Sequence, residues 1–165
     1  MRSAVCHACD ITGWPSTNHH PGAAKPVAAS EVTIAYTLAV APTDDEVRAT
    51  RVAVAAALDN PAVTAAPMAG GTGLVLIVPG AIADWSQVDA AVRSTAPAAT
   101  RGEVQVSLHP APGGDAAARE HAIRSLPGAV LARIETKEGV VRLTFPPESP
   151  PPPTLVWRLR RLLAS

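Results

Sequence analysis

Two stretches of this 165-residue sequence decide its fold: Glu31-Val32-Thr33-Ile34-Ala35-Tyr36 and Glu103-Val104-Gln105-Val106-Ser107-Leu108. The second stretch lies 72 positions after the first, and in both stretches apolar residues alternate with polar or small ones. Such alternation is typical of a β-strand with one buried face. The candidate helix caps Thr43 and Asp115 keep the same offset. We therefore interpret the chain as two copies of one unit.

A second set of matches extends the repeat at an offset of 67 positions. Leu74, Leu76, Val78 and Pro79 correspond to Val141, Leu143, Phe145 and Pro146. Both halves are predicted to run strand, helix, hairpin, helix, as units 31–96 and 103–164. Because each copy needs its neighbour to cover an apolar edge, we expect a single domain over 31–165.

In the first half, the alternation predicts a strand over 31–40. Thr43 and Glu46 form a capping-box pattern that starts a helix. Gly70-Gly71 predicts a two-residue hairpin turn between strands over 63–69 and 72–78, and Pro67 restricts the first of these to a sheet edge. Asp84 is predicted to cap the next helix. The expected buried residues of the first strand and the two helices are Val32, Ile34, Tyr36, Leu38, Val40, Val47, Val54, Leu58, Trp85, Val88 and Val92.

The second half repeats this order with a strand over 103–109, a helix from Asp115 to about Leu126, and a hairpin of strands over 130–136 and 140–145. Thr154 is predicted to cap a terminal helix. Its leucine stripe favours packing on the core, and Trp157 with three arginines leaves open a membrane or partner-helix surface. The stripe comprises Leu155, Leu159, Leu162 and Leu163.

The order of elements predicts an α+β fold in which duplicated βαββα units form a six-stranded antiparallel, ferredoxin-like sheet. Right-handed crossovers and hairpin pairing give the spatial order 63–69, 72–78, 31–40, 103–109, 140–145, 130–136, with the helices on one face. The layout resembles, in topology, the effector-binding domains of bacterial drug-responsive regulators.

The composition limits the classes of function. Basic and acidic residues balance at 14 each, which argues against a nucleic-acid or membrane-surface binder. No apolar run is long enough for a transmembrane helix, and residues 1–30 are predicted to be a disordered tail without a secretory signal. We expect a cytoplasmic protein, and the Ala- and Pro-rich usage suggests a bacterial source.

The uncovered face of the sheet is the predicted binding surface, because an antiparallel sheet leaves one face open. Small and polar residues at its centre and arginines at one side suit a small ligand, a protein partner or a second copy of the chain. The candidate residues are Thr33, Ala35, Thr37, Gln105, Ser107, His109, Arg133 and Arg142.

A Cys-x-x-Cys pair followed by two histidines is the only pattern that suggests a metal. Cys6 and Cys9 with His19 or His20 could supply zinc ligands, although the spacing is shorter than in a zinc finger. The core pattern begins well after Cys9, so we expect no cofactor and treat zinc as the alternative.

Catalysis would need a site around His109, Ser107 or Tyr36, with Asp115 close enough to His109 to form a base. Asp115 is already explained as a helix cap, and no catalytic motif with phosphate-binding glycines or a nucleophile elbow occurs in the sequence. We therefore expect a non-catalytic interaction or small-ligand-binding module. The alternatives are a small enzyme with a His-based site on the sheet face or a zinc-binding N-terminal segment.

Overall fold

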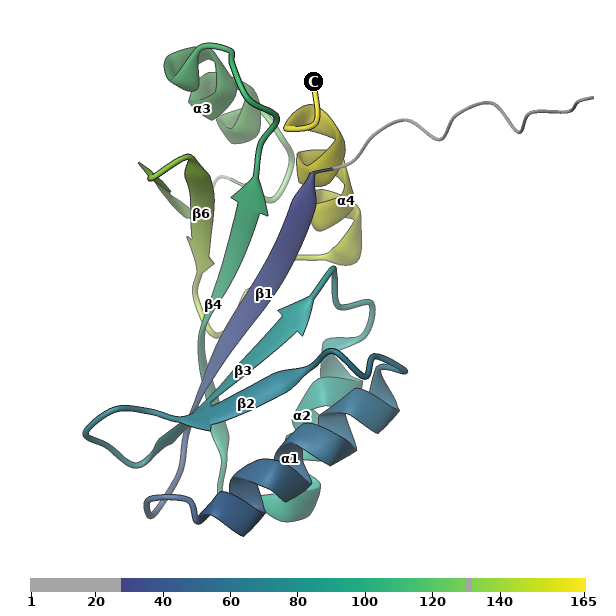
Figure 1. Ribbon diagram of the computed structural model, residues 1–165, viewed down its shortest axis with the longest axis vertical. Coiled ribbons are helices and arrows are strands. Elements are labelled where there is room, and N and C mark those ends of the chain that lie inside the picture. Colours follow the sequence, from purple (N-terminus) through teal and green to yellow (C-terminus); the bar gives the residue numbers. More distant parts are fainter. Residues whose placement is uncertain (1–27, 130–131) are drawn as a thin grey trace, which may run out of the picture.

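The structure is a computed structural model that describes residues 28–129 and 132–165 (Figure 1). Its first five elements are β1 (Ala29–Thr37), α1 (Asp44–Ala57), β2 (Thr64–Pro67), β3 (Gly73–Pro79) and α2 (Trp85–Thr95). The next five are β4 (Thr100–His109), α3 (Ala116–Arg124), β5 (Arg133–Lys137), β6 (Val140–Phe145) and α4 (Pro153–Leu162). Each half therefore runs strand, helix, strand, strand, helix.

The six strands form one sheet in the order β2-β3-β1-β4-β6-β5, and every neighbouring pair is antiparallel. This confirms the strand order predicted from the sequence. The long strands β1 and β4 cross the middle of the molecule, with α1 and α2 beside the sheet toward one end and α3 and α4 toward the other (Figure 1). Thr33 and Gln105, which lie 72 positions apart, are direct partners across this central pair.

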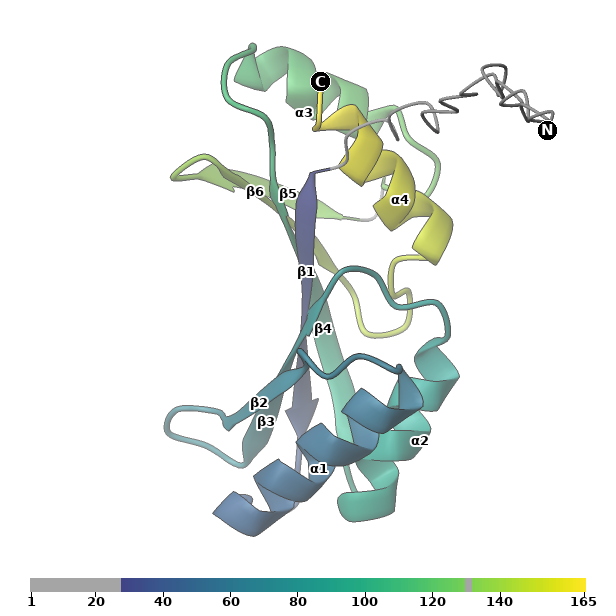
Figure 2. The same ribbon diagram turned by 45° about the vertical axis from the view of Figure 1, so that its right-hand side comes forward.

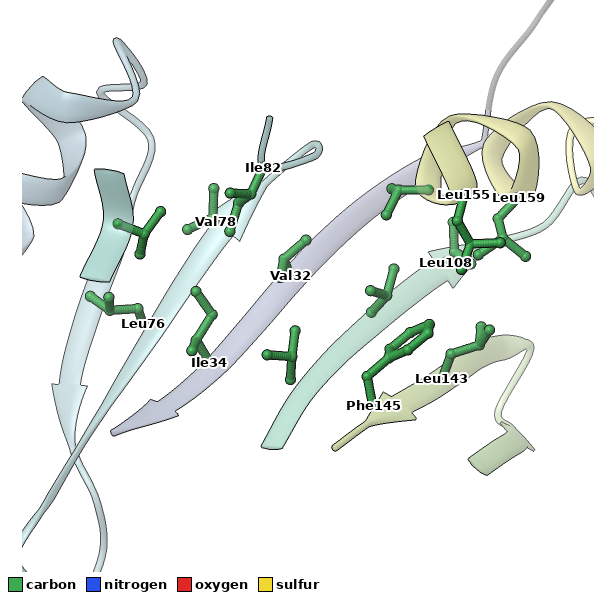
Figure 3. Close-up of a cluster of buried hydrophobic side chains, with 14 of the residues drawn as sticks. Val32, Ile34, Leu76, Val78, Ile82, Leu108, Leu143, Phe145, Leu155 and Leu159 are labelled. Atoms are coloured by element: carbon green, nitrogen blue, oxygen red, sulfur yellow. The ribbon is translucent and has the colours of Figure 1, made fainter. Parts of the chain in front are cut away.

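One face of the sheet is covered by the helices and carries the core, as the alternation predicted (Figure 2). Val32 and Ile34 of β1 lie beside Val104 and Val106 of β4, and all four are fully buried. Figure 3 shows this layer continuing into both hairpins and onto α4. The labelled side chains there are Val32, Ile34, Leu76, Val78, Ile82, Leu108, Leu143, Phe145, Leu155 and Leu159. The core therefore runs through both halves.

The pairing of β1 with β4 contains an irregularity that the alternation did not reveal. Ile34 pairs with Val104, but Tyr36 pairs with Arg101, so β4 holds one extra residue at this point. A β-bulge of this kind changes the face to which the following side chains point. Gly102 lies in the bulge, where an added Cβ would come within 3.3 Å of the carbonyl oxygen of Ala35. The bulge places Arg101 opposite Tyr36, on the helix side of the sheet.

Several boundaries differ from the sequence prediction. β1 begins at Ala29 and ends at Thr37, so Val40 lies outside the sheet and is 69% exposed instead of buried. Residues 68–72 connect β2 and β3, so the predicted two-residue turn at Gly70-Gly71 does not form. Gly70 alone of these two glycines has a positive φ, whereas a two-residue type I′ turn needs it at both positions.

Two further differences concern the second half. β4 begins at Thr100, earlier than the predicted residue 103. β5 spans Arg133–Lys137, and residues 130–131 of the predicted strand lie outside the described residues. Helix α4 follows Pro152 without a side-chain cap, so the prediction of Thr154 as the cap was wrong. Pro153 occupies the first turn, where the missing N–H of proline costs no helical hydrogen bond. The leucine stripe of α4 packs on the core as predicted, while Trp157 remains 51% exposed beneath the Arg161 guanidinium, 4.6 Å from its ring centre.

Candidate functional site

The predicted binding residues lie on the face of the sheet opposite the helices. Thr33 pairs with Gln105, Gln105 with Thr144, and Thr144 with Arg133, so these side chains follow one another across four strands. In the neighbouring row, Ser107 pairs with Arg142. The structure therefore brings five of the eight predicted residues into two adjacent rows: Thr33, Gln105, Ser107, Arg133 and Arg142.

The other three predicted residues lie outside these two rows. Ala35 pairs with Val75 on β3. Thr37 pairs with Thr100 at one end of β1, whereas His109 pairs with Ala29 at the opposite end. Thr37 and His109 therefore lie at opposite ends of β1 and cannot share a site.

The surface of the sheet that points away from the helices has an apolar side and a charged side. Val75 and Ile77 of β3 lie on one side of Thr33, and they are only partly buried. On the other side the rows end in charges of both signs. Sequence reasoning missed three members of these rows, although the alternation of their strands could have identified them: Glu31, Thr144 and Glu135. We call the surface of β2, β3, β1, β4, β6 and β5 that points away from the helices the open face.

The sheet also carries a polar cluster on its helix side, built on the bulge in β4. The Tyr36 hydroxyl donates to Asp89 Oδ1 at 2.7 Å, and Arg101 Nη1 donates to Asp89 Oδ2 at 2.7 Å. The Arg101 guanidinium also lies over the Trp85 ring, 5.4 Å from its centre, and donates to the carbonyl oxygen of Pro147. The cluster thereby joins α2, β1, β4 and the segment after β6.

Burial is the main cause that raises the pKa of Tyr36, and its hydrogen bond to Asp89 raises it further. The hydroxyl is therefore a hydrogen-bond donor held inside the molecule, with the residue only 2% exposed. Such a group suits a structural role better than the role of a general base. The sequence analysis singled out neither Arg101 nor Asp89. The β-bulge that turns Arg101 toward the helices could not be recognised from the apolar alternation, and Asp89 is an ordinary polar residue of α2.

The remaining candidates for chemistry lie apart from this cluster. Asp115 caps α3, with Oδ1 accepting from the amide of Ala117 at 3.0 Å, and His121 is exposed on α3. Cys6, Cys9, His19 and His20 lie outside the described residues. Among the described residues, no group of three or more His, Cys, Asp or Glu side chains is placed to hold a metal ion. None of the described helices is both long and apolar enough to cross a membrane.

The eight predicted residues line none of four cavities or grooves that open on the described part of the molecule. One cavity, of about 150 Å³, lies where β1 leads into α1 and where α2 leads into β4. Its walls are mostly apolar, with Glu46, Thr50 and Thr95 as the polar members. These four cavities or grooves therefore lie away from the predicted face.

Comparison with known proteins gives no family for this chain. No model of a protein family matches it, and no curated protein matches its sequence. Among solved structures, it is similar to the regulatory subunit of aspartate kinase from Thermus thermophilus, with 12% identity, a TM-score of 0.31, and coverage of 84% of this chain and 94% of that chain. It is also similar to E. coli aspartokinase III in complex with aspartate and ADP, with 10% identity, a TM-score of 0.28, and coverage of 84% and 32%. At these scores, function has to be argued from the residues of this chain alone.

Proposed function

We propose that the chain is a non-catalytic binding module and that its open face associates with a second copy of the chain. One observation carries the proposal: the face spans all six strands, and no helix of residues 28–129 and 132–165 covers it (Figure 2). Neighbouring strands lie ~4.8 Å apart and rise ~3.3 Å per residue, so such a face offers up to ~700 Å². That area is close to the ~800 Å² which each partner contributes to a stable interface.

The distribution of side chains supports a copy of the chain as the partner. The central residues of the face are short, including Thr33, Ala35 and Ser107, and such side chains permit two sheets to approach. Beside them, Arg142 and Glu135 provide charges of both signs in one row. A surface that carries both signs is able to complement itself across a two-fold axis. The neutral chain also lacks the excess charge that would oppose self-association.

The same proposal treats the chain as two duplicated βαββα units in a ferredoxin-like arrangement. Its support is the pairing of residues at the 72-position offset: Thr33 faces Gln105 across the central strands. A pseudo-two-fold axis between these two residues would pass through the middle of the open face. We place the centre of the proposed interface at this point.

Matched Gln→Arg substitutions test the interface by sedimentation equilibrium. Gln105→Arg adds a long cation at the centre of the open face, and Gln87→Arg adds the same group at an exposed position of α2. We expect the wild-type chain and Gln87→Arg to dimerise with equal dissociation constants. Gln105→Arg should weaken dimerisation at least ~10-fold, because a desolvated unpaired charge is costly. A wild-type chain that stays monomeric at high micromolar concentration, or two variants that behave alike, would contradict the proposal.

A further inference from the structure

The cavity beside α1 and α2 has polar groups in an otherwise apolar lining. Leu38, Val40 and Leu74 contribute to one wall, and the segment after α2 supplies Pro97 and Ala99. Within this lining, the hydroxyl oxygens of Thr50 and Thr95 lie 2.6 Å apart. Glu46 stands one helical turn before Thr50 on α1. The cavity therefore combines an apolar volume with three neighbouring oxygen-bearing side chains.

The three oxygen-bearing side chains of the cavity retain hydrogen-bond capacity. Three contacts share the two hydroxyl protons: Thr50 Oγ1 lies 2.8 Å from the carbonyl oxygen of Glu46, Thr95 Oγ1 lies 3.1 Å from that of Val92, and one hydroxyl donates to the other across 2.6 Å. A hydroxyl has one proton and two lone pairs, so the two threonines retain capacity mainly as acceptors. Glu46 Oε2 accepts from the amide and hydroxyl of Thr43, while Oε1 makes no hydrogen bond within the described residues. The polar part of the cavity therefore favours a ligand that donates hydrogen bonds.

The charge around the cavity favours a cation. No Lys, Arg or His lines it, and its one charged member is the Glu46 carboxylate. Hydrogen bonds from the backbone and side chain of Thr43 lower the pKa of Glu46, which keeps this carboxylate ionised. Helix α2 ends at Thr95, and the carboxyl end of a helix dipole carries partial negative charge. Asp44 in the first turn of α1 adds to the same negative potential, whereas Asp45 is paired with Arg48 at 3.0 Å and Arg93 lies in the last turn of α2.

The second half of the molecule shows that these polar groups are not required by the fold. A groove there is lined by Gly114, Asp115, Ala118, Arg119, Ala122, Leu162 and Ser165. At the 72-position offset, Ala118 and Ala122 stand where the first half has Glu46 and Thr50. At the 67-position offset, Leu162 stands in place of Thr95. The three acceptors are therefore specific to the first half.

We propose that the cavity lined by Glu46, Thr50 and Thr95 binds a small primary ammonium compound with an apolar body. An ammonium group has three N–H donors, which matches the three acceptors. A cavity of ~150 Å³ accommodates a molecule of benzene size, so the apolar body has about six heavy atoms. This inference does not depend on the open face, which lies on the other side of the sheet.

Three probes with the same branched alkyl body test the ligand class: 3-methylbutylamine, 3-methylbutan-1-ol and 3-methylbutanoate. Their dissociation constants are measured by amide chemical-shift titration of the labelled full chain at pH 7, following Thr50, Thr95 and Ala99. We expect the amine to bind at least ~10-fold more tightly than the alcohol, and the carboxylate to cause no shift at these amides. Equal binding of amine and alcohol, or no shift with the amine at ~10 mM, would overturn the proposal.

Two variants that each remove one carboxylate test whether Glu46 binds the ammonium group. Glu46→Gln removes the carboxylate from the cavity and retains a side chain that completes a capping box. Asp45→Asn removes the same charge one residue away, at a position that does not line the cavity. We expect Glu46→Gln to weaken amine binding ~10-fold and Asp45→Asn to change it less than ~2-fold. Equal effects of the two variants would assign the binding to general surface charge and overturn the site.

A third variant tests the threonine acceptors. Thr50→Val keeps the shape of the side chain and removes its hydroxyl, and we expect ~5-fold weaker binding of the amine. A melting curve on the same sample shows whether the variant is folded. In a folded Thr50→Val chain, unchanged affinity for the amine would contradict the role of the threonine pair. Gln105→Arg should leave amine binding unchanged, which separates this test from that of the open face.

Discussion

The two halves of the molecule share one order of elements but differ in how their helices pack. In the first half, α1 has 14 residues, packs along α2 and is tied to it by the Thr50–Thr95 hydrogen bond. In the second half, α3 has nine residues and touches α4 over a shorter stretch. The polar cluster shows the same difference, because Asp89 of α2 corresponds at the 67-position offset to Val156 of α4, a buried apolar residue. Two halves of equal topology therefore differ in the polar groups that join their helices to the sheet and to each other.

The largest expected effect tests whether the two halves share one core. Leu76 of β3 and Leu143 of β6 occupy equivalent positions and are both fully buried. Leu76→Ala and Leu143→Ala should each lower the free energy of unfolding by ~2–5 kcal/mol, since each leaves a cavity in a close-packed layer. Urea unfolding followed by tryptophan fluorescence and circular dichroism measures this loss.

The number of unfolding transitions in Leu76→Ala and Leu143→Ala tests whether the two halves unfold together. If β1 and β4 join the halves into one unit, both variants should unfold in a single transition by either probe. Two separate transitions, each shifted by only one of the substitutions, would show that the halves unfold independently.

An intermediate effect concerns the polar cluster of the first half. Tyr36 is the only tyrosine in the chain, so its ionisation is visible directly by absorbance near 295 nm. Its pKa is raised in the folded state, so the unfolded chain loses this proton first as the pH rises. Stability should be fully present below pH ~10 and decrease above it, by ~1.4 kcal/mol between pH 9 and pH 11 from this group alone.

Tyr36→Phe is the matched control for this pH dependence. It should lower stability by ~1–2 kcal/mol at pH 7, because it removes the hydrogen bond to Asp89 and leaves the Arg101–Asp89 ion pair in place. The difference in stability between wild type and variant should then decrease above pH 10. A native protein whose tyrosine titrates near pH 10 without unfolding would show that the hydroxyl is not held as described.

The smallest effect compares the two equivalent helix caps. Thr43 accepts from the amide of Glu46 at 3.2 Å, and Asp115 accepts from the amide of Ala117 at 3.0 Å. Thr43→Ala should cost ~1 kcal/mol and Asp115→Ala less, at the lower end of the range for helix caps. Both first turns are exposed, but α1 packs along α2 whereas α3 makes only a short contact with α4, so fraying of α1 costs more. Chemical denaturation of both variants measures the order, and a larger loss for Asp115→Ala would reverse the comparison.

Local pattern was sufficient for much of the fold because apolar alternation and capping depend on neighbouring residues. The caps Thr43, Asp84 and Asp115 and the edge position of Pro67 follow from such rules, and the structure confirms them. Residues of the open face were placed together because their strands alternate regularly. The hydrogen bond from Tyr36 to Asp89 joins residues 53 positions apart, and no local rule predicts it. Asp89 itself had no distinguishing neighbours in the sequence.

The sequence by itself determined which segments contain strands, which side of each strand is mainly apolar, and the order in which the strands pair. Right-handed crossovers and short hairpins leave few alternatives to that order. Tertiary structure decided the rest. The bulge at Gly102 turned Arg101 toward the helices, and the packing of α1 on α2 brought Thr50 to Thr95 and formed one wall of the cavity. These features depend on register and on contacts between distant segments, where a change of one residue moves a side chain to the opposite face of the sheet.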